Sequence, residues 1–452
     1  MRIQNHRKRP IGRLAALVGL LGASAFGALL TASTANATVP DGAQKTLVIV
    51  TQWSTDTDPG LTMAAAQSRV FTGSDSANAY FKEVSGGRIS LVGDKNASGD
   101  VVGPVMLTGA PTCSTSTILD QGKAAATAAG YNVSAYTHII AFFSPKTPCG
   151  WTGMGSLGNG VSGWSVDAWY SGTQVITHEI GHNFTLNHAG STTCTDASGA
   201  KVTFSSTCTT SDYGDPYSTM GNRAAHWYDA AQLIHIGWIT PSQVTTSTTN
   251  GTYTLDPMEQ QNAATRALVI PVDGTTNLYV EHRQSTGRYD QFGTDAVTKG
   301  VSLRLATSTS ETHLLNMTPS DGSFHNSELQ VGQTFTYPGV ASVTLTALDA
   351  TTGVATVKVT HLAPHYVTGK TLPAAQVGTT YSTTITAGGG LPPYRWWVSS
   401  GALPPGLSLT GATATSITLT GTPTTAGTYT FQLRVHDAAD QKAWRWFTIT
   451  IT

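Results

Sequence analysis

The feature that most constrains this chain is the segment HEIGHNFTLNH at residues 178–188. His178 and His182 are four residues apart, so on a helix they share one face, about 40° apart and one turn along. Both imidazoles can then reach one cation. His188 would lie about 9 Å beyond His182 and point roughly 80° away from His178 if the helix continued. The segment therefore predicts a helix that ends near residues 184–186, with a turn that brings His188 back.

Three histidines around one ion leave a fourth position open, which is typical of catalytic rather than structural zinc. Glu179 lies beside the ligands and is placed to take a proton from water instead of binding the metal. The alternative is that these are ordinary surface or core histidines on a helix. A zinc class with a downstream glutamate ligand does not fit, because the next glutamate, Glu259, lies beyond the predicted domain boundary.

The pattern from residue 45 to about residue 239 alternates strands and helices and predicts an α/β (α+β) domain at residues 38–245. Strands are expected at residues 47–50 and 137–143, and helices at about 76–84 and 118–129, with a Gly-rich stretch at 150–163 before the helix of the histidine segment. The Gly-rich stretch is expected to be either a cleft-side edge strand that pairs with an extended peptide or a surface loop.

The composition changes after Pro241 to threonine-rich strands separated by turn residues. The chain has 73 threonines, a bias that suits the exposed faces of β-strands. Alternating apolar residues predict an all-β sandwich domain at residues 246–362 and a further β-sandwich at 366–452.

The first 37 residues carry five basic residues, then an apolar run at residues 14–30, then Ala35-Asn36-Ala37. This order predicts a cleaved secretory signal peptide at residues 1–37 rather than a membrane anchor. Without it, 20 basic and 26 acidic residues remain, a formal charge of −6. A mildly acidic chain is a poor partner for nucleic acid, and no later stretch has the apolar length of a membrane span. We expect a secreted, extracellular protein.

All four cysteines fall within the predicted α/β domain. In an exported chain they predict two disulfides. The sequence does not fix the pairing; joining neighbours would link Cys113 to Cys149 and Cys194 to Cys208, each closing a loop inside one domain. Their spacing matches no zinc-ribbon pattern.

The segment at 178–188 resembles the metzincin zinc motif, and residues 212–221, DYGDPYSTMG, resemble the Met-turn of gametolysin-type peptidases. The similarity continues at residues 80–87 and 225–239. This resemblance implies a metzincin-like catalytic domain, zinc bound by His178, His182 and His188, Glu179 as general base, and Met220 as an apolar floor below the metal. The chain departs from the pattern at Thr185, where metzincins have a glycine, so the turn is expected to be reshaped or strained.

The last domain resembles Ig-like modules of secreted bacterial proteins, through residues 403–407 and 421–429. Four tryptophans, at 396, 397, 444 and 446, could stack on a glycan or another surface polymer if exposed, although tryptophans in a sandwich more often pack in its core.

The sequence as a whole predicts a secreted zinc-dependent endopeptidase acting on protein or peptide substrates, with a β-sandwich and an Ig-like module appended. One alternative is a surface- or glycan-binding protein with an inert zinc domain. Another is a zinc hydrolase acting on a different amide, such as one in a cell-wall peptide. The retained Glu179 favours a hydrolase, because structural zinc needs no general base.

Overall fold

The computed structural model describes residues 39–56, 60–144, 149–221, 224–272, 276–308, 310–362, 364–366, 368–412, 415–438 and 441–452. The predicted signal peptide lies outside the described residues. The chain divides into two compact units. The first comprises Met1–Gly190, Thr209–Trp238 and Gly287–Asp290, and the second comprises Ser191–Cys208, Ile239–Thr286 and Gln291–Thr452. The predicted boundaries at residues 245, 246, 362 and 366 stay predictions.

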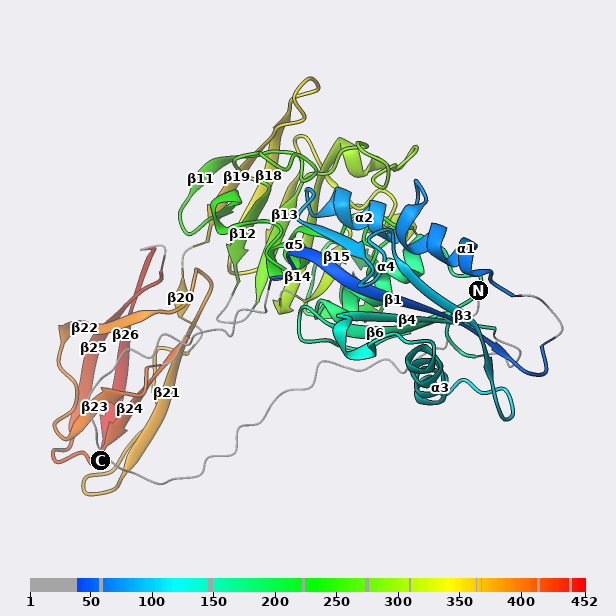
Figure 1. The fold of residues 1–452 in the computed structure, drawn as a ribbon. Helices are drawn as coiled ribbons and strands as arrows, with labels where there is room; N and C mark the ends of the chain where they lie inside the picture. Colours follow the sequence, from blue (N-terminus) through cyan, green and yellow to red (C-terminus); the bar gives the residue numbers. More distant parts are fainter. Residues whose placement is uncertain are drawn as a thin grey trace. The chain divides into compact units, whose positions relative to one another are not determined.

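A mixed β-sheet forms the middle of the first unit (Figure 1). Its strand order is β2-β1-β4-β6-β5, and β3 pairs with the second half of β1. The pairs are parallel except for β5, which runs antiparallel to β6 at the end of this order. The strands are β1 (Gly42–Trp53), β2 (Ile89–Val92), β3 (Asp100–Leu107), β4 (His138–Phe143), β5 (Gly153–Gly155) and β6 (Gly163–Ala168).

Helices cover both faces of this sheet. Alternate residues of β4, Ile139 and Phe143 among them, share a hydrophobic cluster with Ile118 of α3. The other face of β4 carries His138, whose Nδ1 lies 3.0 Å from the Asn183 side-chain oxygen at the end of α4. Figure 1 shows α3 on one side of β1, β4 and β6, with α2 on the other. The helices are α1 (Met63–Gln67), η1 (Ser68–Thr72), α2 (Ala77–Val84), α3 (Thr115–Ala128), η2 (Val133–Ala135), α4 (Thr173–Asn183) and α5 (Ala230–His235).

Two β-sheets pack together in the second unit and share one core, to which Leu268 and Leu303 of one sheet and Val343 and Val357 of the other contribute. The smaller sheet has the order β11-β19-β18-β17, formed by Gly251–Leu255, Ala355–His361, Ala341–Leu348 and Thr334–Tyr337. The larger has the order β10-β12-β13-β14-β15-β7-β8, with β16 on β14 and β9 on β7. Its strands are β7 (Ala189–Thr195), β8 (Lys201–Val202), β9 (Thr207–Ser211), β10 (Val244–Thr246), β12 (Ala267–Pro271), β13 (Asn277–Glu281), β14 (Gly300–Ser308), β15 (Glu311–Leu315) and β16 (Leu329–Gln330). Short 3-10 turns lie at η3 (Pro241–Gln243), η4 (Ala296–Lys299) and η5 (Pro319–Asp321).

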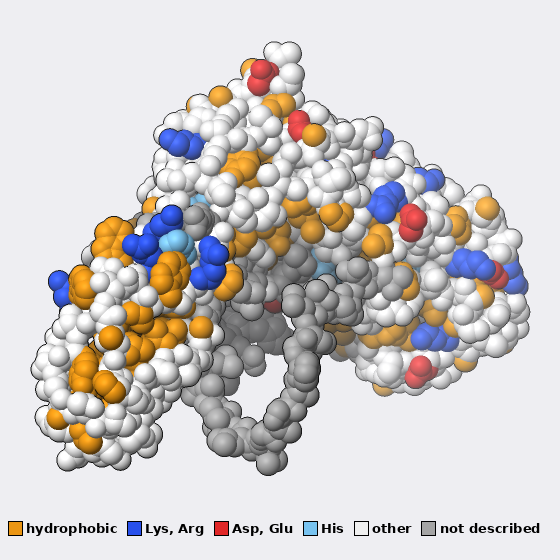
Figure 2. Space-filling view, turned by 90° about the vertical axis from the view of Figure 1, so that its left-hand side faces the viewer, with side chains coloured by type: hydrophobic (Ala, Val, Ile, Leu, Met, Phe, Trp, Pro, Cys, Tyr) orange, Lys and Arg blue, Asp and Glu red, His pale blue; other side chains and the backbone are white. Residues whose placement is uncertain are grey.

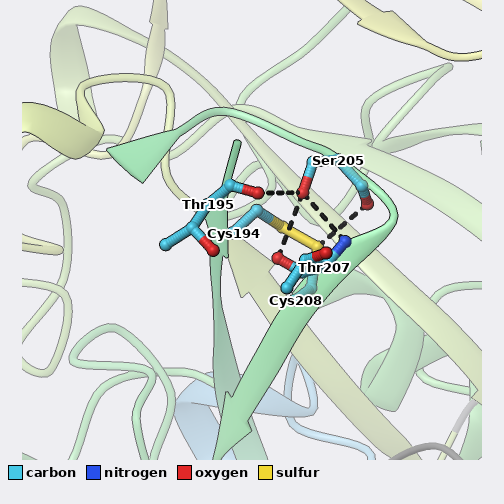
Figure 3. The surroundings of a disulfide bond; sticks show 5 residues. All are labelled: Cys194, Thr195, Ser205, Thr207 and Cys208. Carbon is cyan, nitrogen blue, oxygen red and sulfur yellow. Dashed lines mark hydrogen bonds between the residues drawn. A yellow bond between two sulfur atoms is a disulfide. The ribbon is translucent and has the colours of Figure 1, made fainter. Parts of the chain in front are cut away.

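Both predicted disulfides are present, Cys113–Cys149 and Cys194–Cys208. The second joins β7 to β9 (Figure 3). Close to it, the Ser205 hydroxyl donates to the Thr195 carbonyl at 2.7 Å and accepts from the Thr207 N–H at 3.0 Å. The pairing of neighbours along the chain is therefore confirmed.

The C-terminal module is built from two further sheets around its own core. One has the order β20-β21-β24-β23, from His365–Tyr366, Tyr381–Gly388, Ser416–Gly421 and Leu407–Thr410. The other has the order β22-β25-β26, from Arg395–Gly401, Gly427–His436 and Lys442–Ile451. The core includes Leu433 and Phe447, and β25 and β26 follow the alternation read from the sequence. Among the described residues, no helix combines the length and apolarity needed to cross a membrane.

Candidate metal centre

Helix α4 carries the first two histidines of the candidate site. Its buried residues Ile176 and Ile180 anchor it in the unit. His178 and His182 lie on one side of the helix, with ring centroids 4.9 Å apart. This is the arrangement that their four-residue spacing predicts.

The helix ends in a left-handed turn that reverses the chain. The Leu186 N–H donates to the Gly181 carbonyl at 3.0 Å, and the Thr185 N–H donates to the His182 carbonyl at 2.9 Å. These two bonds form a Schellman motif, with Thr185 at the left-handed position. The turn brings the His188 ring to 5.4 Å from that of His178 and 5.1 Å from that of His182.

Thr185 has a φ of 70°. The turn is therefore not reshaped; a β-branched residue adopts the left-handed backbone that glycine adopts more easily. Its hydroxyl lies 2.9 Å from Nε2 of His235, in the last turn of α5. This hydrogen bond offsets part of the backbone cost, and it gives His235 a structural partner.

Each of the three imidazoles is held through its Nδ1 atom. That atom lies 2.9 Å from the Thr219 carbonyl oxygen in His178, 2.7 Å from the Leu186 carbonyl oxygen in His182 and 3.0 Å from the Asp212 carboxylate in His188. An Nδ1 that donates to an oxygen leaves Nε2 of a neutral ring as an electron-pair donor. One ligand atom from each histidine can be chosen so that all three lie within 4.8 Å of one another. Three imidazole nitrogens so arranged fit a zinc ion.

Burial keeps two of these rings neutral. Burial, followed by the neighbouring His182 and His188, lowers the pKa of His178 to about 3. Burial, followed by His188, lowers the pKa of His182 to about 4. Near neutral pH both rings are therefore in the form that binds a metal.

Glu179 lies in an enclosed carboxyl pocket and is only 6% exposed. Burial raises its pKa well above the usual value, the nearby Asp167 raises it further, and a hydrogen bond from the Gly155 backbone lowers it. Asp167, on β6, is fully buried, and burial raises its pKa to about 7, against a hydrogen bond from Ser165. A buried carboxyl beside a second one is a common feature of acid–base sites.

Gly153 of the strand β5 closes this pocket without filling it. A Cβ atom at this position would lie 2.6 Å from Oε1 of Glu179 and 2.8 Å from Oδ1 of Asp167. No side chain fits there unless a carboxyl group moves. The Gly-rich stretch therefore forms a short strand directly beside the candidate base, at the end of the sheet order.

The predicted Met-turn lies against helix α4. Met220 is fully buried, and its sulfur is 2.5 Å from where a Cβ of Gly181 would be. The Ala189 N–H, directly after His188, donates to the Met220 carbonyl at 3.0 Å. Asp215 holds the turn, since its carboxylate accepts from the Tyr217 N–H at 2.8 Å.

The contacts of Tyr213, Asp212 and Asp167 at the site were not anticipated from the sequence. The Tyr213 ring lies tilted against the His188 ring, with centroids 3.7 Å apart, and is nearly parallel to the His178 ring at 5.7 Å. The Asp212 carboxylate lies 3.0 Å from Nδ1 of His188 and so orients that ring. The sequence feature that could have pointed to Tyr213 is its place in the Met-turn segment. For Asp167, the feature is a carboxyl group in a short strand before the helix.

His226 has a structural role. It is buried, and its Nδ1 lies 3.0 Å from the Tyr289 carbonyl oxygen and 3.4 Å from the Asp290 carboxylate. It takes no part in the three-histidine cluster.

The chain belongs to the gametolysin peptidase M11 family, whose model matches residues 45–327, more than half of the chain. It is therefore a peptidase of a family that is generally metal-dependent, and it contains a histidine triad able to bind a metal. The model of an Ig domain family matches residues 363–452. No curated protein is similar enough to the chain to count as a match.

Solved structures show only distant similarity. The titin M3 domain is 15% identical, covers 20% of this chain and 97% of its own, and has a TM-score of 0.17. Titin domain M7 is 16% identical, with coverages of 20% and 96% and a TM-score of 0.17. An endo-fucoidan hydrolase of glycoside hydrolase family 107 is 11% identical, with coverages of 46% and 27% and a TM-score of 0.19. Scores this low carry no argument about this chain.

Proposed function

We propose that this peptidase is a secreted zinc-dependent endopeptidase with a metzincin-like catalytic domain. The observation that carries the proposal is the fixed tautomer of the triad: each Nδ1 is hydrogen-bonded to an oxygen, so the Nε2 atoms can converge beside a buried glutamate. A core or surface histidine needs no such arrangement. Three histidines held in this way, with the buried Glu179 beside them, favour catalysis over structural metal binding.

His178, His182 and His188 would hold one zinc ion, with Met220 as the floor beneath it. When bound, zinc supplies Lewis acidity, which lowers the pKa of water and polarises a carbonyl group. Glu179 would accept a proton from water at its carboxylate. Burial raises the pKa of Glu179, which strengthens its carboxylate as a base and suits it to pass that proton to the departing amine.

Strand β5 would position the peptide substrate. It is at the end of the sheet order, next to Glu179, and it presents Met154, whose side chain is exposed. Leu157, two residues beyond the strand, is also exposed. An extended peptide could add to this edge through backbone hydrogen bonds, with the two apolar side chains contacting it.

The proposal that the protein is secreted rests on the signal-peptide pattern of residues 1–37 and on the two disulfides, which form in oxidising compartments.

We further propose the division into a catalytic domain at 38–245, a β-sandwich at 246–362 and an Ig-like module at 366–452. The separate hydrophobic cores of the two β regions support this division.

The decisive experiment compares Glu179→Gln with the unaltered protein. Zinc content should be unchanged, because the three histidines remain, whereas casein hydrolysis should fall by roughly 10²–10⁴-fold through loss of proton transfer. Glu311→Gln is a matched control, since the Glu311 side chain is 55% exposed on the β-sandwich. Full activity in Glu179→Gln would refute its role as the base.

The same preparations distinguish the other two interpretations. If the unaltered protein, supplied with zinc, cleaves neither casein nor a cell-wall peptide, the result would support a binding protein with an inert site. Cleavage of the cell-wall peptide alone would support a hydrolase acting on a different amide.

A further inference from the structure

One sheet of the C-terminal module presents aromatic and basic side chains on its outer side. In the sheet β22-β25-β26, the inward residues Phe431, Leu433 and Phe447 complete the core. The alternating residues point the other way. We call the outward group the Trp–Arg face and define it by Arg395, Trp397, Arg434, Lys442, Trp444 and Trp446.

Strand register places these residues in rows. Arg434 of β25 lies opposite Trp397 of β22 on one side and Trp444 of β26 on the other. The next row joins Arg395, His436 and Lys442 in the same way. Directly opposite residues on neighbouring strands have Cβ atoms about 5 Å apart, so the arginine is flanked by two indoles.

The three tryptophans are exposed. Trp444 is 61% exposed, Trp446 45% and Trp397 37%. Tryptophans in a sandwich more often pack in its core, but these three do not. Trp396 does pack against the core, from the opposite side of β22. Exposed tryptophans gathered on one sheet are typical of a binding surface.

Charge is distributed unevenly along the chain. Residues 363–452 contain five basic and two acidic residues, whereas residues 38–362 contain 15 basic and 24 acidic residues. Of the two acidic residues, Asp437 is buried and accepts from the backbone of Leu391 and Gln441, and Asp440 lies outside the described residues. Figure 2 shows basic, histidine and hydrophobic side chains gathered on this module. Its exposed cations complement an anionic partner.

The guanidinium group of Arg434 has a hydrogen-bond donor that is not used by any described residue. Its Nε–H is shielded from solvent and has no hydrogen-bond partner within the described part of the chain. A buried donor without a partner costs free energy, and an acceptor would satisfy it once the side chains that shield it moved aside. The row centred on Arg434 thus combines two exposed indoles with an unused donor.

We propose that the Trp–Arg face binds an anionic polysaccharide. Sugar rings would stack on the indoles, and Arg395, Arg434 and Lys442 would pair with carboxylate or sulfate groups. Trp397 and Trp444 stand two strand spacings apart, about 10 Å, so one polymer chain can contact both. This site is independent of the proposed peptidase activity.

Two other anionic partners fit the face less well. Nucleic-acid binding rests on a strongly basic domain, whereas this module has an excess of only three basic residues and the mature chain is acidic. Membrane-surface binding rests on an amphipathic helix or a lipid anchor, whereas the Trp–Arg face is a sheet with cations between its indoles. Both partners are outcomes of the test.

The test measures retardation of the full-length protein in native gels that contain polygalacturonate, dextran sulfate or neutral dextran. Polygalacturonate and dextran sulfate separate carboxylate from sulfate recognition, and at least one should retard the protein in a salt-sensitive manner. Neutral dextran should not. Trp444→Thr and Arg434→Gln should each weaken binding about tenfold. Lys358→Gln removes one exposed positive charge from β19 and should have little effect.

Several results would overturn the proposal. These are absence of binding to both anionic polymers, equal binding to neutral dextran, equal weakening by Lys358→Gln, or tighter binding to duplex DNA or to vesicles containing phosphatidylserine. Thermal unfolding checks that the variants fold, and Trp446→Thr is a second exposed substitution should Trp444→Thr not fold. Casein cleavage should be unchanged in all variants, so failure here is distinguishable from failure of the proposed peptidase function.

Discussion

The candidate metal centre and the Trp–Arg face use polar side chains in opposite ways. At the metal centre, each histidine is fixed by an oxygen acceptor, and Glu179 is buried beside a second carboxyl group. On the Trp–Arg face, the indoles are exposed, and Arg434 keeps a donor without a partner among the described residues. Fixed groups suit one transition-state geometry, whereas exposed groups suit a repetitive polymer that can bind in many registers.

This comparison depends on how tightly the metal centre is enclosed, and Gly153→Ala tests that most strongly. The new methyl group would contact Glu179 and Asp167 at less than 3 Å, so the base must move. Displacement of about 1 Å costs roughly 10²-fold in rate. We expect kcat on a soluble peptide to fall by this factor while zinc content stays unchanged.

Gly172→Ala is the matched control for this substitution. Gly172 precedes the same helix, has a φ of −89°, and a Cβ there would meet nothing within 4 Å. Its kcat should stay within about twofold of the original. Similar kcat values for the two variants would show that the pocket tolerates the methyl group and is not rigid.

Asp167→Asn tests the electrostatic side of the enclosure. Burial raises the folded-state pKa of Asp167 to about 7, from about 3.9 in an unfolded chain. Folding thus favours the protonated carboxyl, and this stabilisation is complete below about pH 4 and is lost as the pH rises to about 7. Between pH 5 and 6, the metal-free protein should lose about 1.4 kcal/mol of unfolding free energy relative to Asp167→Asn.

Urea unfolding of chelator-treated protein at several pH values measures this difference. Asp120→Asn is a control, because Asp120 lies exposed on α3. If the original protein and Asp167→Asn show the same pH profile, Asp167 does not titrate in this range and the pocket is wetter than its burial indicates.

The sequence predicted the elements of the fold well where periodicity was strong. The strand at 137–143 and the helix at 76–84 correspond to β4 and α2. It did not reveal that β7, β8 and β9 join the large sheet of the second unit. β8 and β9 pair with β7, which is close to them in the sequence, but β7 itself pairs with β15, far along the chain, so local patterns contain no information about that pairing.

At the site, spacing alone brought His178 and His182 together, because a helix fixes the distance between residues four apart. The contacts of Asp167 and Tyr213 could not be read in this way, since they depend on how separate segments pack. The exposure of Trp397, Trp444 and Trp446 was likewise left open by the sequence. Alternation shows which residues share a face of a strand but not which face is covered.

Substitution of Thr185 is expected to change stability least, because two opposing contributions to the unfolding free energy nearly cancel. Thr185→Gly loses the hydroxyl bond to His235, worth about 1 kcal/mol, but relieves a backbone cost of order 1 kcal/mol. Its unfolding free energy and zinc retention should therefore change little. Thr185→Ala loses the hydroxyl and keeps most of the backbone cost, so it should be less stable than both by about 1 kcal/mol. Urea unfolding and a chelator titration of the three proteins separate the two terms. Marked zinc loss in Thr185→Gly, with zinc retained in Thr185→Ala, would show that the turn needs a stiff residue and that the backbone strain argued here is absent.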